Sequence, residues 1–190
     1  NWGQRRGLLS SVRAALEPHG GTIRERPSLR VVSDGEQRLG FIFGTGLVAR
    51  FFERYYASGA GGYPAAARIV ARVFVGSFVS DSYSRSVLEP MSCTLEVDGK
   101  LLEDRAFSLI CCSVVRDLGL HLLVTHRADE DPERPHLAAS ALSTRALGPQ
   151  APRVLAGKPL SGPQNFDDLV ERFTLSFPGD GGPYVLDGDV

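Results

Sequence analysis

The chain has 190 residues, of which 43% are hydrophobic and 23% are charged, and its formal net charge is -1 at pH 7. This length is sufficient for one domain with its own hydrophobic core, and the balanced charge excludes the overall basic field of a nucleic-acid-binding protein. Nearly all of the positive charge is arginine, since Lys100 and Lys158 are the only lysines, and the arginines are dispersed. The composition therefore leaves only local anion binding open as an electrostatic function.

Three cysteines are present, Cys93, Cys111 and Cys112. The last two are adjacent in what reads as one strand, so their side chains should point to opposite faces of a sheet. We expect small buried hydrophobic side chains of a reducing compartment rather than a disulfide framework or a zinc site.

No targeting segment is recognisable after Asn1. A membrane span is not expected, because charged side chains interrupt the most apolar region, namely Arg50, Glu53, Arg54, Arg68 and Arg72.

The first part of the chain predicts a helix followed by a hairpin. Apolar residues at helical spacing over residues 7–18, with Gly20-Gly21 as a stop, indicate a short amphipathic helix. The runs SLRVV and RLGFIFG flank Asp34-Gly35, a strong signal for a β-hairpin turn.

Two adjacent helices are expected between about residues 46 and 78. Gly59 can end the first, and Pro64 suits the start of the second. The positions expected to face inward are Leu47, Val48, Phe51, Phe52, Tyr55 and Tyr56, then Ile69, Val70, Val73 and Phe74.

From Met91 onward the sequence is typical of β-structure. A strand, a turn at Asp98-Gly99 and a long strand over FSLICCSVV are expected, followed by another strand over LGLHLLVTHR. HLAASALSTRAL fits a helix, with Leu137, Ala141 and Leu142 inward. ERFTLSF alternates as a strand does, and PGDGGP turns the chain into YVLDGDV. The Pro- and Gly-rich segment over residues 146–166 is expected to be a surface excursion.

Several hairpins with few crossover connections predict an α+β fold that is mainly β. We expect an antiparallel β-sandwich or barrel with a few inserted helices at its edge.

The main chemical candidate is Asp187-Gly188-Asp189. The sequence has four Asp-Gly pairs, and those at Asp34, Asp98 and Asp180 are explained as turns because an apolar run follows each. Asp187 has no such run after it. Two carboxylates flanking a glycine could deprotonate a hydroxyl and hold Mg²⁺, although a plain turn is the alternative that the spacing leaves open.

The remaining candidates are weaker. His121, His126, Asp129 and Asp131 could form a metal site, but a surface histidine and an acidic loop are favoured, because two histidines five apart on a strand face opposite ways. Ser113 and Ser140 lack the G-x-S-x-G context of a hydrolase.

Two further segments leave a choice between structure and binding. Gly44-Thr45-Gly46 could present amides to an anion or could simply permit a tight turn into the helix. The aromatic face that begins at Phe51 could be core or could line a lipid pocket.

Four segments, taken in order, resemble the diacylglycerol kinase and sphingosine kinase type of lipid kinases. YVLDGDV is similar to the C-terminal D-G-E signature, and GFIFGTGLVARFF is similar to the Gly-rich segment that opens the second domain of that family. LEVDGK is similar to its middle hairpin, and FSLICCSVVRDLGLHLLVTHRADE to the long strands that follow. The resemblance covers about residues 22–190.

The resemblance implies an ATP-dependent lipid kinase in which residues 22–190 form the C-terminal β-rich, lipid-acceptor domain. Asp187 would then be the catalytic base and Asp189 would help to place Mg²⁺, with Gly44, Gly46 and Phe51 at the substrate. Residues 1–21 would be a helical junction to an N-terminal nucleotide-binding domain. That domain would hold most of the ATP, because no G-G-D-G-T string occurs here, and the isolated domain would be inactive.

The implied partners are a lipid alcohol, the N-terminal domain and, transiently, a membrane surface met by a cytoplasmic enzyme, with no nucleic acid. The sequence also departs from the family. Asp189 is shorter than the usual Glu, and residues 118–137 lack the Ala-Pro and D-G-x-L pattern, so the structural cation site of the family is not carried over. The alternatives are a non-catalytic lipid- or ligand-binding domain that kept the fold, or an NAD kinase-like enzyme.

Overall fold

The computed structural model describes residues 27–59, 62–79, 81–179 and 181–189. The helix expected over residues 7–18, the junction over 1–21 and Asp180 lie outside these residues. The strands are β1 (Leu29–Ser33), β2 (Glu36–Gly40), β3 (Ile42–Gly46), β4 (Met91–Ser92), β5 (Thr94–Val97), β6 (Lys100–Leu101), β7 (Ala106–Phe107), β8 (Leu109–Ser113), β9 (His136–Ser140), β10 (Asn165–Leu169), β11 (Phe173–Ser176) and β12 (Tyr184–Leu186). The helices are α2 (Leu47–Ala57), α3 (Tyr63–Val79), α4 (Ser82–Leu88), α5 (Thr144–Leu147), the 3-10 turn η1 (Gly148–Gln150) and α6 (Ala151–Leu155).

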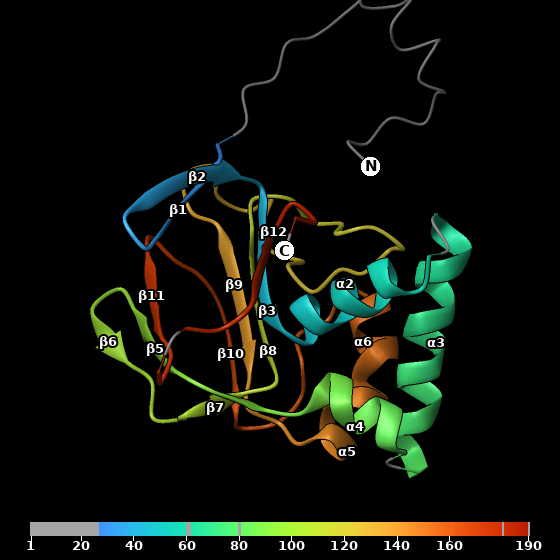
Figure 1. Ribbon diagram of the computed structural model, residues 1–190. Helices are drawn as coiled ribbons and strands as arrows, with labels where there is room; N and C mark the ends of the chain where they lie inside the picture. Colours follow the sequence, from blue (N-terminus) through green and yellow to red (C-terminus); the bar gives the residue numbers. More distant parts are fainter. Residues whose placement is uncertain (1–26, 60–61, 80, 180, 190) are drawn as a thin grey trace, which may run out of the picture.

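A five-stranded antiparallel sheet in the order β10-β9-β8-β3-β12 is the centre of the fold. A three-stranded sheet, β11-β5-β6, and two hairpin-like pairs, β1-β2 and β4-β7, complete the β-structure of the described residues. Figure 1 shows the helices gathered on one side of the central sheet, with the smaller sheets on the other. The α+β class, mainly β with helices beside antiparallel sheets, is confirmed.

The two faces of the central sheet carry separate hydrophobic clusters. On the helix side, Cys111 packs with α3 and α4, whereas Cys112 belongs to the cluster shared with the smaller sheets. Both thiols are fully buried and free. The prediction that these neighbours point to opposite faces as small buried side chains is therefore confirmed.

The predicted helices over residues 46–78 are present as α2 and α3. Ile69 and Val73 are buried as expected, but Val70 and Phe74 are only partly buried, and the inward position predicted for Tyr56 is wrong, because its side chain is 55% exposed. The hairpins at Asp34-Gly35 and Asp98-Gly99 are also present.

The two wrong assignments lie between β8 and α5. LGLHLLVTHR is not a strand, because the chain turns at Leu120 and His121, both with positive φ, after an Asp117 carboxylate that accepts from the Gly119 amide. HLAAS is not helical but forms β9, which is buried along its whole length. A strand covered on both faces reads as a continuous apolar run, so its sequence lacks the alternation that would identify it.

Within the described residues, no helix has the length and apolar character needed to cross a membrane.

Candidate functional site

Asp187 and Gly188 are the two central residues of a tight turn. Both have positive φ, 55° and 101°, and the turn is closed by Leu186 and Asp189, whose amides each donate to the other's carbonyl at 3.0 Å. Asp34-Gly35 and Asp98-Gly99 have nearly the same φ values, as expected for Asp-Gly at the centre of type I′ turns. The absence of a long following strand therefore does not distinguish Asp187, contrary to the sequence argument.

The carboxylate of Asp187 is held by the backbone at the start of β3. Its Oδ1 accepts from the amides of Phe41 and Ile42, each at 2.9 Å, and Oδ2 lies 3.1 Å from the Phe41 amide. Gly40 makes this approach possible, since a Cβ there would lie 2.8 Å from Asp187 Oδ2 and 2.6 Å from Leu186. The carboxylate is thus fixed in position, while its exposed Oδ2 keeps an acceptor site for a further group.

Asp98 has the same arrangement elsewhere in the fold. Its Oδ1 accepts from the amides of Glu171 and Arg172 at 3.0 and 2.9 Å, between β10 and β11. No catalytic role is assigned to Asp98, so a carboxylate that accepts from two amides is by itself a structural feature of these turns. Asp98 is therefore an internal control for Asp187.

Asp189 and the main chain of Gly188 complete the turn. The Asp189 side chain is exposed, and its carboxylate has no hydrogen-bond or ion-pair partner within the described residues. The hydroxyl of Tyr56, from α2, donates to the carbonyl of Gly188 at 2.6 Å. An exposed, unpartnered carboxylate suits Mg²⁺, which prefers carboxylate oxygen and keeps several waters.

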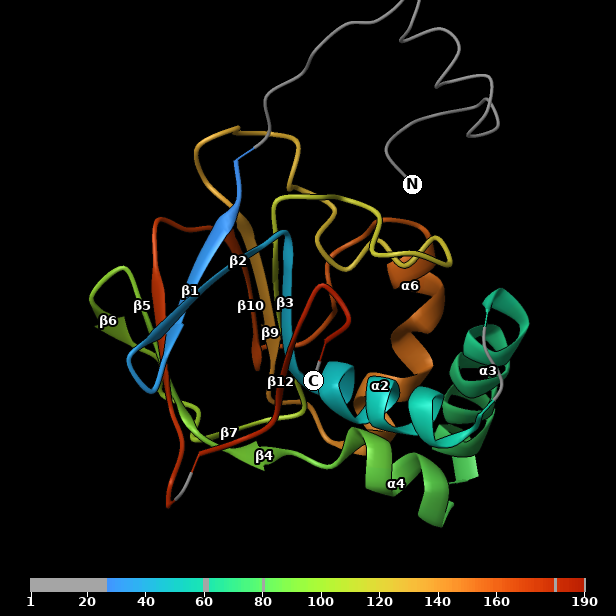
Figure 2. The ribbon, with the colours of Figure 1, turned by 45° about the horizontal axis from the view of Figure 1, so that its top comes forward.

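A cavity of about 980 Å³ lies on the β side of the central sheet. Phe43 contributes to its wall from β3, and residues of β1 and β11 also line it. Figure 2 shows that β1 and β11 lie on the side of the central sheet away from the helices. Its apolar wall includes Leu29, Val31, Val114, Val170, Phe173, Leu175, Phe177 and Tyr184. Arg30, Glu133, Glu171 and Arg172 contribute charged groups. This volume is at the upper end of the range for small-molecule sites.

The cavity and the Asp187 turn are neighbours. Phe43, in the cavity wall, directly follows Ile42, whose amide holds the Asp187 carboxylate. Tyr184 is also in the wall and is three positions before Asp187 on β12. No residue from Asp187 to Asp189 lines the cavity, and Gly188 instead contacts Tyr56 of α2, so the carboxylate and the cavity are linked only through Phe43 and Tyr184.

Gly44, Gly46 and Phe51 lie on the opposite, helix side of the sheet. A Cβ at Gly44 would lie 2.4 Å from Val48, so Gly44 lets α2 pack closely on β3. Gly46, at φ 65° and ψ -120°, turns the chain into α2, and the first helical amide, of Leu47, donates to the Ser108 carbonyl at 2.7 Å. Phe51 packs against the helix-side cluster. These three residues do not border the large cavity, and their substrate contacts stay a prediction.

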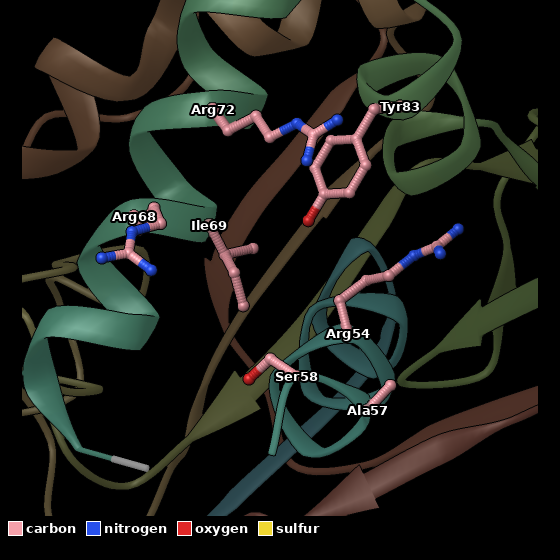
Figure 3. A pocket seen from close by; sticks show the side chains of 7 residues that line it. All are labelled: Arg54, Ala57, Ser58, Arg68, Ile69, Arg72 and Tyr83. Carbon is pink, nitrogen blue, oxygen red and sulfur yellow. The ribbon is translucent and has the colours of Figure 1, made fainter. Parts of the chain in front are cut away.

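A second cavity, of about 300 Å³, lies between α2, α3 and α4. Arg54, Arg68, Arg72 and Tyr83 are among its lining residues, and the guanidinium carbon of Arg72 lies 3.8 Å from the centre of the Tyr83 ring. In Figure 3 the guanidinium of Arg68 points away from Tyr83, and that of Arg54 also leads out of the cavity. The arginines do not converge on one point, so this cavity is a weaker candidate for an anion site.

One cluster was missed by sequence reasoning. His126 was expected on the surface, but its side chain is only 14% exposed and lies beside His136 and Asp167. The expected exposure holds for His121, which is 68% exposed and pairs with Asp117 at 3.7 Å. His136 and Asp167 lie on segments whose strand character was not predicted, so no spacing in the sequence could have connected the three.

Comparisons with known proteins give limited information. No protein-family model matches the chain, and no curated protein does. Two crystal structures from Bacillus anthracis str. Sterne, both described as diacylglycerol kinases, are similar to it. One has a TM-score of 0.45 and 14% identity over 81% of this chain and 43% of its own, and the other a TM-score of 0.48 and 13% identity over 83% and 47%.

The chain therefore spans less than half the length of either structure. Similarity at this level does not establish a family, and function has to be argued from the residues of this chain.

Proposed function

We propose that this chain is the lipid-acceptor domain of an ATP-dependent lipid kinase of the diacylglycerol or sphingosine kinase type. The observations that carry the proposal are the backbone-held carboxylate of Asp187 and a cavity of about 980 Å³, whose wall includes Phe43 of β3 and Tyr184 of β12. A lipid alcohol has a long apolar chain and a hydroxyl at one end. The apolar residues of the cavity suit the chain, and the hydroxyl would reach from there to the Asp187 carboxylate.

In this proposal Asp187 is the general base. The lipid hydroxyl oxygen forms a bond to the terminal phosphorus of ATP as the bond from that phosphorus to the ADP oxygen breaks. The hydroxyl proton passes to Asp187 Oδ2, the oxygen with an acceptor site still open. The Phe41 and Ile42 amides hold the carboxylate in place, which is the main requirement for a base in phosphoryl transfer.

Asp189 is proposed to hold Mg²⁺, whose role would be to neutralise charge on the transferred phosphate. Its exposed and unpartnered carboxylate supports this role, and the short Asp side chain requires the phosphates to approach the turn closely. ATP itself would be bound mainly by a separate nucleotide-binding domain, and membrane contact would be transient.

The test is phosphorylation of diacylglycerol or sphingosine by the full-length protein with ATP and Mg²⁺. We expect Asp187→Asn to lower kcat by at least about 100-fold, as for the loss of a general base. Asp98→Asn is the matched control, because it changes the same kind of turn with the same kind of amide contacts. Asp98 also pairs with Arg134 at 3.8 Å and holds Glu171 and Arg172 of the cavity wall, so this variant should alter KM at most and leave kcat within about twofold. Equal activity of the two variants would contradict the base role.

A non-catalytic lipid-binding domain is the second candidate. It is favoured by the likeness of Asp187 to Asp98, since the turn needs no chemistry to explain its hydrogen bonds. Binding of the lipid alcohol without phosphorylation, and without an effect of Asp187→Asn, would support it.

A further inference from the structure

His126, His136 and Asp167 come from three separate segments and meet beside the edge of the central sheet. His136 begins β9 and is fully buried, Asp167 is on the neighbouring strand β10, and His126 lies in the long irregular segment between β8 and β9. One possible ligand atom from each lies within 4.8 Å of the others. Such a segment without regular structure is uncommon in a compact domain unless something fixes it or uses it.

The distances in the cluster are not explained by hydrogen bonding alone. Nε2 of His136 is 3.0 Å from Asp167 Oδ1, which is a hydrogen bond. Nε2 of His126 is 3.9 Å from the same oxygen, too far for a hydrogen bond, and Nδ1 of His126 is buried without a partner within the described residues. Two ligands held at about 2.1 Å by one tetrahedral ion are about 3.4 Å apart, and the two observed separations bracket that value.

The charge of Asp167 also needs a partner. Its side chain is 19% exposed, and the two histidines are the only basic groups within 4.0 Å in the described part of the chain. Arg127, nearby in sequence, instead pairs with Glu130 and Asp168 at 2.9 Å. A largely buried carboxylate is stabilised by hydrogen bonds or by a cation, and a metal ion at this point would add the second to the hydrogen bond from His136.

We infer that His126, His136 and Asp167 bind a divalent transition metal, with Zn²⁺ the best match. Two imidazole nitrogens and one carboxylate oxygen are a set that Zn²⁺ accepts and that Mg²⁺ and Ca²⁺ do not prefer. Water fills the remaining position. The ion ties the segment that carries His126 to β9 and β10, so its role is to hold that segment against the sheet.

Zn²⁺ binding through His136 would require one existing contact of that ring to open. The amide of Arg127 lies 3.4 Å from His136 Nδ1, in a position to donate to it. Ligation through Nε2 places the ring proton on Nδ1, so this long contact has to open. The Arg127 amide should therefore be among the backbone groups that respond to the metal.

The experiment is calorimetric titration of the chelator-treated chain with ZnCl₂, followed by thermal unfolding with and without the metal. We expect one saturable site and a rise in Tm on binding. Asp167→Asn keeps the shape of the side chain, and His126→Gln replaces the less buried histidine, so both should fold. Each should weaken Zn²⁺ binding by at least about 100-fold, more than is typical when only a supporting residue around a metal site is lost.

His121→Ala is the control, because His121 is exposed and outside the cluster, and it should bind Zn²⁺ as the unchanged chain does. A Co²⁺-substituted sample should show the visible spectrum of a four- or five-coordinate ion without a thiolate charge-transfer band. The inference is overturned by the absence of saturable binding, by unchanged affinity in both cluster variants, or by a thiolate band. The cluster would then be a His136–Asp167 hydrogen bond with His126 packed beside it.

Discussion

Gly46 offers a sharp test of how the turn from β3 into α2 is built. A Cβ at this position would lie 2.6 Å from the carbonyl oxygen of Ser108, which is main chain and cannot move as a side chain would. The same carbonyl accepts from the Leu47 amide at 2.7 Å, so displacing it also weakens the hydrogen bond that ties the first residue of α2 to Ser108. Gly59, at the end of α2, has almost the same φ, 61° against 65°, but nothing within 4 Å of its Cβ position.

Both variants, Gly46→Ala and Gly59→Ala, place a Cβ on a residue with positive φ, but at Gly46 the ψ of -120° lies outside the left-handed region and the Cβ also meets the Ser108 carbonyl. A positive φ costs an L-residue about 1–2 kcal/mol, and this is the whole effect expected at Gly59. At Gly46 an overpacked contact of about 1–3 kcal/mol and a weakened hydrogen bond of about 1 kcal/mol are added. We therefore expect a loss of about 3–6 kcal/mol in the free energy of unfolding for Gly46→Ala. At roughly 2–4 °C per kcal/mol for a chain of this size, Tm should fall by about 6–24 °C.

Urea denaturation followed by far-UV circular dichroism measures both losses. Equal losses in the two variants would refute the steric argument, because the Ser108 carbonyl would then not press on Gly46. A Gly46→Ala variant that was as stable as the Gly59→Ala variant but could not use its lipid substrate would instead support a substrate contact at Gly46.

Two further outcomes are expected. Tyr56→Phe removes the hydroxyl that donates to the Gly188 carbonyl at 2.6 Å, and it should lower the free energy of unfolding by about 0.5–1 kcal/mol. Tyr63→Phe, at an exposed tyrosine, should leave the free energy of unfolding unchanged. Equal losses in the two variants would contradict the contact between Tyr56 and Gly188. Burial raises the pKa of the Cys111 thiol to about 12, and burial followed by the neighbouring Cys111 raises the pKa of Cys112 further. Above about pH 9 the unfolded thiols lose their protons while the folded ones keep them, so the free energy of unfolding should fall by up to about 1.4 kcal/mol per pH unit for each thiol. Denaturation curves between pH 8 and 10 measure this fall, and rapid reaction of the two native thiols with a disulfide reagent at pH 8 would contradict it.

Local patterns in the sequence predict the parts of the fold that depend on local chemistry. The Asp34-Gly35 and Asp98-Gly99 hairpins follow from turn residues that accept positive φ. The apolar spacing of α2 and α3 follows from helical periodicity, and the opposite faces of Cys111 and Cys112 follow from strand geometry.

The secondary-structure predictions are wrong where burial in the folded protein, rather than the local sequence, decides the structure. β9 is buried on both faces, so HLAAS carries no alternation, and its pattern equally fits the start of a helix. The segment LGLHLLVTHR is apolar enough for a strand but is broken by the positive φ of Leu120 and His121.

The candidate site also combines residues that the sequence identifies with contacts that the sequence does not predict. Asp187 and Asp189 stand out in the sequence, but the contacts of Asp187 with Phe41 and Ile42 span nearly the whole chain and could not be read from spacing. The likeness of Asp187 to Asp98 became visible only in three dimensions. So did the meeting of His126, His136 and Asp167, because it depends on the pairing of β9 with β10.

The central claim is that the cavity on the β side of the sheet holds the chain of a lipid alcohol whose hydroxyl lies at Asp187. Photocrosslinking tests this most directly, with a diacylglycerol or sphingosine analogue that carries a diazirine near the end of its apolar chain. After irradiation with the full-length protein, we expect mass spectrometry to find the label on β1, on β11 or on the residues before β12, and an excess of the unlabelled lipid to remove it. Labelling confined to α2 and α3, or labelling that the unlabelled lipid does not reduce, would contradict the account.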